Sequence, residues 1–200
     1  FPALEIGETS RKCPRCGGPT QSVVLPYLGV KVEEDGSQAV APPIEVVLDN
    51  IRSAFNVGSI FRTSDGAAVT HLHLCGITPT PDQPKVAKTA LGSELTVEWT
   101  QHWDTLTAMD QLKQRNFRIL GLEGASDSRS IFNFSISDQN QPFALVVGNE
   151  ITGLDPAVLN FCDARLHIPM FGNKKSLNVA TAYGVAIYFL RYLCSKIQAH

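Results

Sequence analysis

Three short segments of the sequence hold most of the polar residues that helix and strand propensities would not have chosen, and each follows an apolar run. The first covers residues 50–63. Asn56 is suited to cap a helix, Gly58 permits close backbone approach, and Arg62 presents a fixed fork of donors to a phosphate or carboxylate. An N-capped helix that carries a surface arginine is the alternative interpretation.

The second segment, residues 146–154, places two glycines around a carboxylate. Gly148 and Gly153 suit a loop whose backbone meets a ligand closely, with Glu150 between them. The segment has neither the G-x-G-x-x-G spacing of a dinucleotide-binding turn nor the lysine of a phosphate-binding loop. A plain connection from strand to helix is the alternative.

The third segment, residues 168–180, leads from an apolar run into the last predicted helix. Ser176 is predicted to cap that helix. Asn178 then lies inside the first turn, where asparagine is a poor helix former and a buried carboxamide needs hydrogen-bond partners. A binding site at this point would supply them.

The elements that position these segments alternate along the chain, because short apolar runs predict strands and the stretches between them predict helices. Such alternation favours an α/β fold, a mostly parallel sheet with helices on both faces. The first two polar segments then lie at the carboxyl edge of the sheet, where open sheets bind ligands. The predicted strands are 44–48, 71–75, 117–120, 143–147 and 165–168, and the predicted helices are 57–68, 86–91, 103–115, 156–161 and 177–197.

The last predicted helix, residues 177–197, is apolar nearly all round. Tyr183 and Leu190 recur at helical spacing on one side, while Val185 and Tyr188 lie on the other. A helix of this kind is buried on more than one side. We therefore expect a homodimer through this C-terminal helix.

Length and composition fit an ordinary globular protein with a substantial core. The 200 residues are 44% hydrophobic and 18% charged, and their formal net charge of -2 excludes a global positive field, so any nucleic-acid site is local. The sequence contains no apolar run of the roughly 20 residues that a membrane span needs and no signal-peptide pattern. Cys75, Cys162 and Cys194 lie singly in apolar stretches, as reduced thiols do. We expect a cytoplasmic protein with no membrane partner.

Residues 1–40 differ in character from the rest, and we expect them to form an N-terminal appendage and linker before a domain that covers residues 41–200. Cys13 and Cys16 resemble one knuckle of a zinc ribbon, but a tetrahedral zinc site needs four ligands and no second pair lies near. We therefore expect no metal site completed within this sequence. Ligands upstream, a metal shared by two subunits, or a plain turn are the alternatives for this pair.

Taken in order, the three segments resemble the three motifs of the SpoU-type branch of the SPOUT superfamily, the knotted RNA 2'-O-ribose methyltransferases that include the TrmH family. The resemblance rests on N-x-G-x-x-x-R from Asn56, G-N-E-x-x-G-L from Gly148, and I-P-M-x-G from Ile168 followed by S-L-N-V-A from Ser176. It implies an α/β fold with a deep C-terminal trefoil knot, a rare exception to the rule that chains do not thread. It also implies S-adenosylmethionine as cofactor and methyl transfer to a ribose 2'-hydroxyl of structured RNA, either tRNA or rRNA, with no role for DNA.

The resemblance further implies the site residues, with a bent cofactor held mainly by backbone groups of three loops. The catalytic set is Asn56, Arg62, Glu150, Ser176 and Asn178, and the cofactor set is Leu122, Glu123, Gly124, Gly148, Asn149, Glu150, Ile168, Met170 and Leu177. Because Lys174 and Lys175 adjoin this site, we expect them to contact RNA phosphates together with Arg62.

A guanidinium has a pKa above about 12 and does not readily give up a proton. We therefore interpret Arg62 as an electrostatic clamp on the target phosphate and the nascent alkoxide. Asn56 and Ser176 are expected to hold Arg62 and the ribose in register, Glu150 to orient polar groups, and Asn178 to brace loop backbone. Two other classes stay open: a non-catalytic RNA-binding or assembly protein with the same fold, and a metabolite-binding α/β protein, which the acidic net charge favours.

Overall fold

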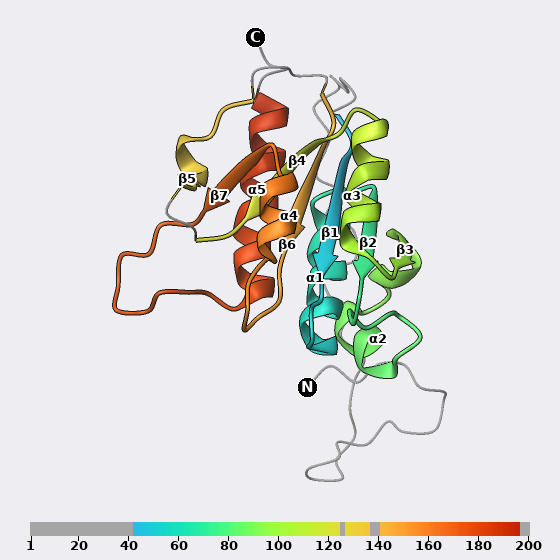
Figure 1. The fold of residues 1–200 in the computed structure, drawn as a ribbon. Helices are drawn as coiled ribbons and strands as arrows, with labels where there is room; N and C mark the ends of the chain where they lie inside the picture. Colours follow the sequence, from blue (N-terminus) through green and yellow to red (C-terminus); the bar gives the residue numbers. More distant parts are fainter. Residues whose placement is uncertain (1–41, 125–126, 137–140, 197–200) are drawn as a thin grey trace, which may run out of the picture. The chain divides into compact units, whose positions relative to one another are not determined.

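The computed structural model describes residues 42–124, 127–136 and 141–196 (Figure 1). The expected appendage, with Cys13 and Cys16, lies outside these residues.

A seven-stranded sheet forms the centre of this domain, and all of its pairings between strands are parallel. The strand order is β3-β2-β1-β6-β4-β7-β5. This confirms the mostly parallel sheet predicted from the alternation of elements. The strands are β1 (Ile44–Asp49), β2 (His71–Cys75), β3 (Glu98–His102), β4 (Arg118–Leu122), β5 (Arg129–Ser130), β6 (Phe143–Val147) and β7 (Ala164–His167).

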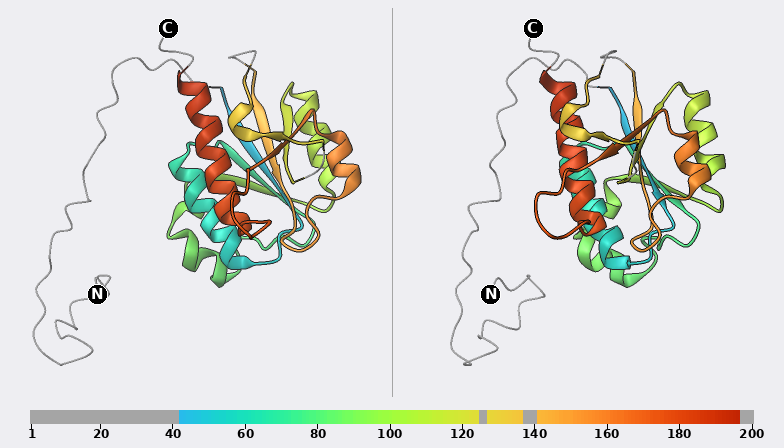
Figure 2. Two further views of the ribbon diagram at one scale, coloured as in Figure 1. Left: turned by 90° about the vertical axis from the view of Figure 1, so that its left-hand side faces the viewer. Right: turned by 60° about the vertical axis from the view of Figure 1, so that its left-hand side comes forward.

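Helices cover both faces of the sheet, as Figures 1 and 2 show. α1, α2 and α5 lie on one face, and α3 and α4 lie on the other. None of the helices in the described ranges is long and apolar enough to cross a membrane. The helices are α1 (Ala54–Gly66), α2 (Pro84–Ala90), α3 (Thr105–Gln114), α4 (Pro156–Phe161) and α5 (Val179–Lys196), with two short 3-10 turns, η1 (Ser93–Leu95) and η2 (Ile131–Asn133).

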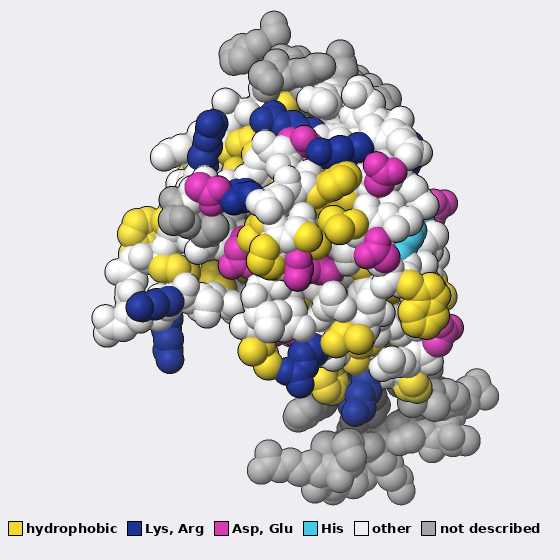
Figure 3. Space-filling view, viewed as in Figure 1, with side chains coloured by type: hydrophobic (Ala, Val, Ile, Leu, Met, Phe, Trp, Pro, Cys, Tyr) yellow, Lys and Arg dark blue, Asp and Glu magenta, His cyan; other side chains and the backbone are white. Residues whose placement is uncertain are grey.

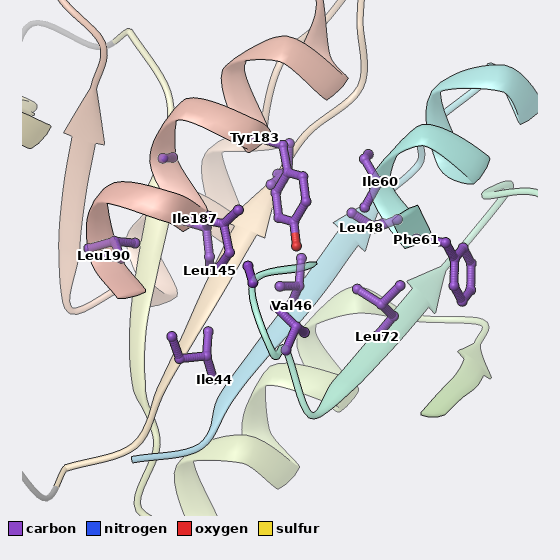
Figure 4. Close-up of a cluster of buried hydrophobic side chains, with 14 of the residues drawn as sticks. Ile44, Val46, Leu48, Ile60, Phe61, Leu72, Leu145, Tyr183, Ile187 and Leu190 are labelled. Carbon is purple, nitrogen blue, oxygen red and sulfur yellow. The ribbon is translucent and has the colours of Figure 1, made fainter. Parts of the chain in front are cut away.

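The hydrophobic core has two layers because successive side chains of a strand point to opposite faces. Val46 of β1 packs beneath α1 and α5, whereas Val47 packs against α3 and its neighbours. Figure 4 shows the first layer, in which Tyr183 of α5 points toward the sheet. Its buried hydroxyl lies 2.7 Å from Oγ of Ser64 in α1, and this hydrogen bond fixes α5 on α1.

The observed elements differ from the predicted ones at the start of the first helix and at two strands that were not predicted. The first helix begins at Ala54 rather than at residue 57, because Ser53, and not Asn56, is its N-cap: Ser53 Oγ accepts from the backbone N–H of Asn56 at 3.3 Å. Strand β3 was not predicted, because this edge strand carries mostly exposed polar residues and lacks an apolar run. The two-residue β5 is too short to leave any pattern in the sequence.

Candidate active site

The polar segments lie at the carboxyl edge of the sheet, beside β1. At β1 the order in which strands are added to the sheet reverses from one side to the other. β2 and β3 lie on one side of β1, while β6, β4 and β7 lie on its other side. Residues 50–56 follow β1, and residues 148–153 follow its neighbour β6. In open parallel sheets ligands bind in the crevice at such a reversal.

The Glu150 carboxylate closes over the turn between β1 and α1. Its Oε2 accepts a hydrogen bond from the backbone N–H of Arg52 at 2.9 Å, and its Oε1 accepts from the backbone N–H of Ser53 at 3.0 Å. The Asn56 side chain donates from Nδ2 to the same Oε1 at 2.9 Å. Burial opposes ionisation of Glu150, but these hydrogen bonds, led by the one from Arg52, outweigh burial and lower its pKa below the ordinary 4.5. Glu150 is therefore an anion held by uncharged donors.

Asn178 extends this network to the third segment. Its Nδ2 donates to Oδ1 of Asn56 at 3.2 Å. Its own Oδ1 accepts from the backbone N–H groups of Ala180 and Thr181, at 2.9 and 3.3 Å. Asn178 therefore caps α5, so the prediction that Ser176 is the cap and that Asn178 lies inside the helix was wrong. The capping position removes the conflict with the low helix propensity of asparagine.

Arg62 and the loop before α5 stand apart from this network. Arg62 is exposed on α1, six residues beyond Asn56, which corresponds to a rise of about 9 Å and a rotation of about 240°. Ser176, Lys174 and Lys175 are exposed in the loop that leads to α5. Within the described residues, none of these four side chains forms a hydrogen bond or an ion pair. The structure thus brings Asn56, Glu150 and Asn178 together. It leaves the four other side chains of this paragraph exposed to solvent.

The three loops implied for the cofactor follow adjacent strands, β6, β4 and β7. The Glu123 side chain joins the first two, since its Oε2 accepts from the backbone N–H of Leu154 at 2.9 Å. Gly153, with φ of 70°, lies beside this carboxylate, where an added Cβ would be 2.3 Å from Oε2. The backbone N–H of Glu123 donates to the carbonyl of Leu166 in β7 at 2.8 Å. Because these strands are adjacent and parallel, the residues that end or follow them lie at one edge of the sheet: Leu122, Glu123, Gly124, Gly148, Asn149, Glu150, Ile168 and Met170. Leu177 lies in the exposed loop before α5.

Comparison with known proteins agrees with this geometry. The model of the SpoU rRNA Methylase family matches residues 43–188, which include all three polar segments. The chain belongs to the SpoU rRNA methylase family. It is 31% identical over 147 residues to the tRNA (guanosine(18)-2'-O)-methyltransferase of Thermus thermophilus, covering 74% of this chain and 73% of that protein. It is 30% identical over 148 residues to the 23S rRNA (guanosine(2553)-2'-O)-methyltransferase RlmP of Bacillus subtilis, covering 73% of this chain and 57% of that protein.

Solved structures of SpoU methyltransferases share the fold. The structure of AviRb from Streptomyces viridochromogenes, in complex with the cofactor AdoMet, has a TM-score of 0.69 and 27% sequence identity, and the alignment covers 78% of this chain and 62% of that chain. An AdoMet-bound rRNA methyltransferase from Sinorhizobium meliloti gives a TM-score of 0.70 at 25% sequence identity. This alignment covers 76% of this chain and 57% of that chain. This SpoU chain therefore spans less than two thirds of RlmP and of both structures.

Sequence reasoning missed several groups of the SpoU chain that shape the site. The backbone amides of Arg52 and Ser53 bind Glu150, and no side-chain pattern reveals such a role. Asn50 adopts the left-handed conformation, with φ of 55°, and its carbonyl accepts from Nδ2 of Asn149 at 2.8 Å. An asparagine directly after a predicted strand is a signal for this turn, because asparagine tolerates positive φ better than most residues.

Proposed function

We propose that this SpoU-family protein transfers a methyl group from S-adenosylmethionine to a ribose 2'-hydroxyl of a structured RNA, either tRNA or rRNA. The observation that carries the proposal is the hydrogen-bonded chain from Glu150 through Asn56 to Asn178, which joins one residue of each family motif at the carboxyl edge of the sheet. The relatives in Thermus thermophilus and Bacillus subtilis, named as tRNA and rRNA 2'-O-methyltransferases, support the same reaction.

The donor set at this edge fits S-adenosylmethionine. Leu122, Ile168 and Met170 are half-buried apolar side chains, suited to an adenine ring and an aliphatic thioether, and the loop backbone beside them offers amides and carbonyls. At Gly124 no atom of the described residues lies within 4 Å of the place where a Cβ would stand, which leaves this backbone accessible to a ligand. We assign the cofactor to the loops after β4, β6 and β7, with Leu177 over the adenine. When bound, this cofactor supplies the methyl group as an electrophilic sulfonium.

The roles of the chain's own residues follow from their positions. The guanidinium of Arg62 is exposed and unpaired within the described residues, so we assign it to the target phosphate and to the alkoxide that forms as the 2'-hydroxyl loses its proton. The phosphate or solvent takes that proton, since a guanidinium does not. Ser176 is assigned to the ribose. Glu150 and Asn178 hold the turn and the start of α5, and Asn56 links them, which makes these three positioning residues.

The RNA-contacting residues include Lys174 and Lys175, because both are exposed in the loop that adjoins the site. We also propose a homodimer through α5. Val185, Tyr188 and Tyr192 follow one another at helical spacing and are 37%, 52% and 50% exposed. A second copy would cover this stripe and would bring another set of site residues close.

The finer features of the fold also belong to the proposal. We propose that the C-terminal region is threaded as a deep trefoil knot, which the family motifs imply, and that residues 1–40 form an appendage to the domain of residues 41–200. The free thiols of Cys75, Cys162 and Cys194 support a reducing, cytoplasmic location.

The test is methyl transfer from labelled S-adenosylmethionine to separate pools of unmodified tRNA and rRNA. We expect label in one pool with the wild-type protein and almost none with Arg62→Ala. Arg129→Ala is the matched control, because Arg129 is an exposed arginine on β5 at the far end of the sheet. Binding of RNA and cofactor without any transfer would favour a non-catalytic RNA-binding protein and contradict the proposal.

A further inference from the structure

The cations of the described residues differ in whether a carboxylate pairs with them. On the side of α3 and α4, Nζ of Lys113 lies 3.2 Å from Oδ1 of Asp163. Arg115 pairs with Glu45, and Arg165 pairs with Asp127. By contrast, no carboxylate of the described residues lies within ion-pair distance of the cations on α1 and α2. These unpaired cations are Arg62, Lys85 and Lys88, and Arg52 lies in the turn directly before α1.

In Figure 3, dark-blue side chains lie among yellow ones at the lower end of the molecule, over α1 and α2, while magenta carboxylates gather across the middle. Unpaired cations among apolar side chains are typical of surfaces that bind nucleic acid, since the cations bind phosphates and the apolar groups contact bases.

α2 is held rigidly against α1, which fixes its lysines relative to the site. A Cβ on Gly58 of α1 would lie 2.0 Å from Oγ1 of Thr89 and 2.3 Å from the carbonyl oxygen of Val86, so the two helices meet at van der Waals contact only because residue 58 is glycine. Thr89 Oγ1 also lies 3.3 Å from the carbonyl oxygen of Phe55. The position of α2 is therefore set by the first turns of α1.

The lysines of α2 face away from this contact. Val86 and Ala90 are buried toward α1, whereas Lys85 and Lys88 are exposed three residues apart, which places them on one face of the helix. They are the basic residues of a helix that contains no carboxylate. Two positive side chains thus point outward from one face with no internal partner.

An exposed aromatic side chain lies in the part of α1 that contacts α2. Phe55 is 50% exposed in the first turn of α1, and its carbonyl is the group that Thr89 of α2 contacts. On α1, Phe55, Gly58 and Arg62 follow a spacing of three and four residues, so they share one stripe of the helix. α2 packs on this stripe at Gly58, between the exposed ring and the arginine of the proposed site.

We propose that α2 and the start of α1 form an RNA-contact surface beyond the methyl-transfer site, in which Lys85 and Lys88 bind backbone phosphates and Phe55 stacks on an unpaired base. This inference rests on the proposed function, since it takes structured RNA as the substrate. Single-stranded loops are the parts of RNA whose bases are free to stack on an aromatic side chain. The surface selects an RNA that presents such a loop beside the target nucleotide.

The test is RNA affinity measured against salt concentration, with an unmodified tRNA transcript as the probe. We expect the double variant K85Q/K88Q to bind more weakly and to lower the slope of log affinity against log salt by about 2, one for each lost phosphate contact. Glutamine preserves helix propensity, so α2 is expected to stay folded. The control R129Q removes an exposed cation at the far end of the sheet and is expected to leave the slope unchanged.

Phe55→Ala separates stacking from charge. We expect it to weaken binding of the transcript about tenfold without changing the salt slope, and to leave binding of a fully paired RNA duplex unchanged. A salt slope for K85Q/K88Q equal to that of R129Q would overturn the proposed phosphate contacts. If Phe55→Ala weakened binding of the duplex as much as binding of the transcript, the proposed stacking would be overturned.

Methyl transfer by the wild-type protein distinguishes this inference from the proposed function. With transfer observed, we expect K85Q/K88Q to raise KM for RNA and to leave kcat unchanged. If the wild-type protein transfers no methyl group, the proposed function fails. The salt slopes then still decide whether α2 contacts RNA.

Discussion

Two carboxylates at opposite ends of the sheet have partners of different kinds. Glu45, near the amino end of β1, is 4% exposed and pairs with the guanidinium of Arg115 and with Nε2 of His73 at 2.8 Å. Glu150, after the carboxyl end of β6, is held by backbone amides and the carboxamide of Asn56. The first carboxylate pairs with a guanidinium and an imidazole, and the second uses uncharged donors.

The difference shows how a chain with an acidic net charge keeps cations free for an anionic substrate. At the amino end, positive and negative groups cancel within the molecule. At the carboxyl end, Glu150 is satisfied without a cation, so Arg52 has no ion pair within the described residues, and neither has Arg62 further along α1. The local field at the proposed site is thus set by pairing, and the total charge does not determine it.

The largest effect is expected from Arg62→Ala, which removes the free cation assigned to the substrate. We expect the rate at saturating RNA to fall about 100- to 1,000-fold, as it does when one transition-state donor is lost. The thermal midpoint is expected to stay unchanged, because Arg62 is exposed and makes no described contact. Single-turnover methyl transfer and a thermal melt measure the two quantities, and near-full activity would contradict the clamp.

A large effect on stability is expected from Glu45→Ala at the other end of the comparison. The change leaves Arg115 and His73 without their shared partner, and we expect a loss of about 3 kcal/mol in the free energy of unfolding. Urea denaturation measures it. Asp110→Ala, at an exposed carboxylate of α3, is the control and is expected to cost less than about 1 kcal/mol. Equal losses of unfolding free energy from the two changes would show that the interactions of Glu45 contribute no more to stability than an exposed carboxylate does.

A smaller effect is expected from Glu150→Gln, which keeps the shape of the side chain and removes its charge. One glutamine oxygen accepts from Ser53 and Asn56, but the amide nitrogen then faces the N–H of Arg52, so one hydrogen bond is lost. We expect a loss of about 1 kcal/mol in urea denaturation, since the group is exposed. We also expect slower methyl transfer, and an unchanged rate would remove Glu150 from the positioning set.

The smallest effect is expected from mild acid and concerns the histidines beside Glu45. Burial, and then the neighbouring His73, lowers the pKa values of His71 and His102 below the ordinary 6.5. The folded state therefore binds fewer protons than the unfolded state, so stability is retained above pH 6.5 and declines as the pH falls below it. Urea denaturation at a series of pH values measures the decline, which we expect His102→Gln to reduce. A free energy of unfolding that rises as the pH falls toward 5.5 would contradict this prediction.

The sequence allowed the parallel sheet and the three polar segments to be predicted, because both rest on local patterns. The strands His71–Cys75 and Phe143–Val147 and the helix Pro156–Phe161 were predicted with their observed bounds. Strand β3 was not predicted because an edge strand need not be apolar on both faces, so it leaves no apolar run in the sequence.

The site was less predictable because much of it is backbone. The residue types of Glu150, Asn56 and Asn178 are visible in the sequence, but their mutual hydrogen bonds depend on where three distant turns meet. The separation of Arg62 from this network was equally hidden, since it depends on the rotation of α1 relative to its neighbours.

The central claim is that the methyl group reaches a ribose oxygen, and the most direct measurement is where the label lies in the product RNA. A methylated 2'-oxygen cannot attack the adjacent phosphate, so alkali leaves a labelled dinucleotide uncleaved at that position. We predict label in alkali-resistant dinucleotides from one of the tRNA and rRNA pools. Label recovered only in mononucleotides, as base methylation would give, would contradict the account.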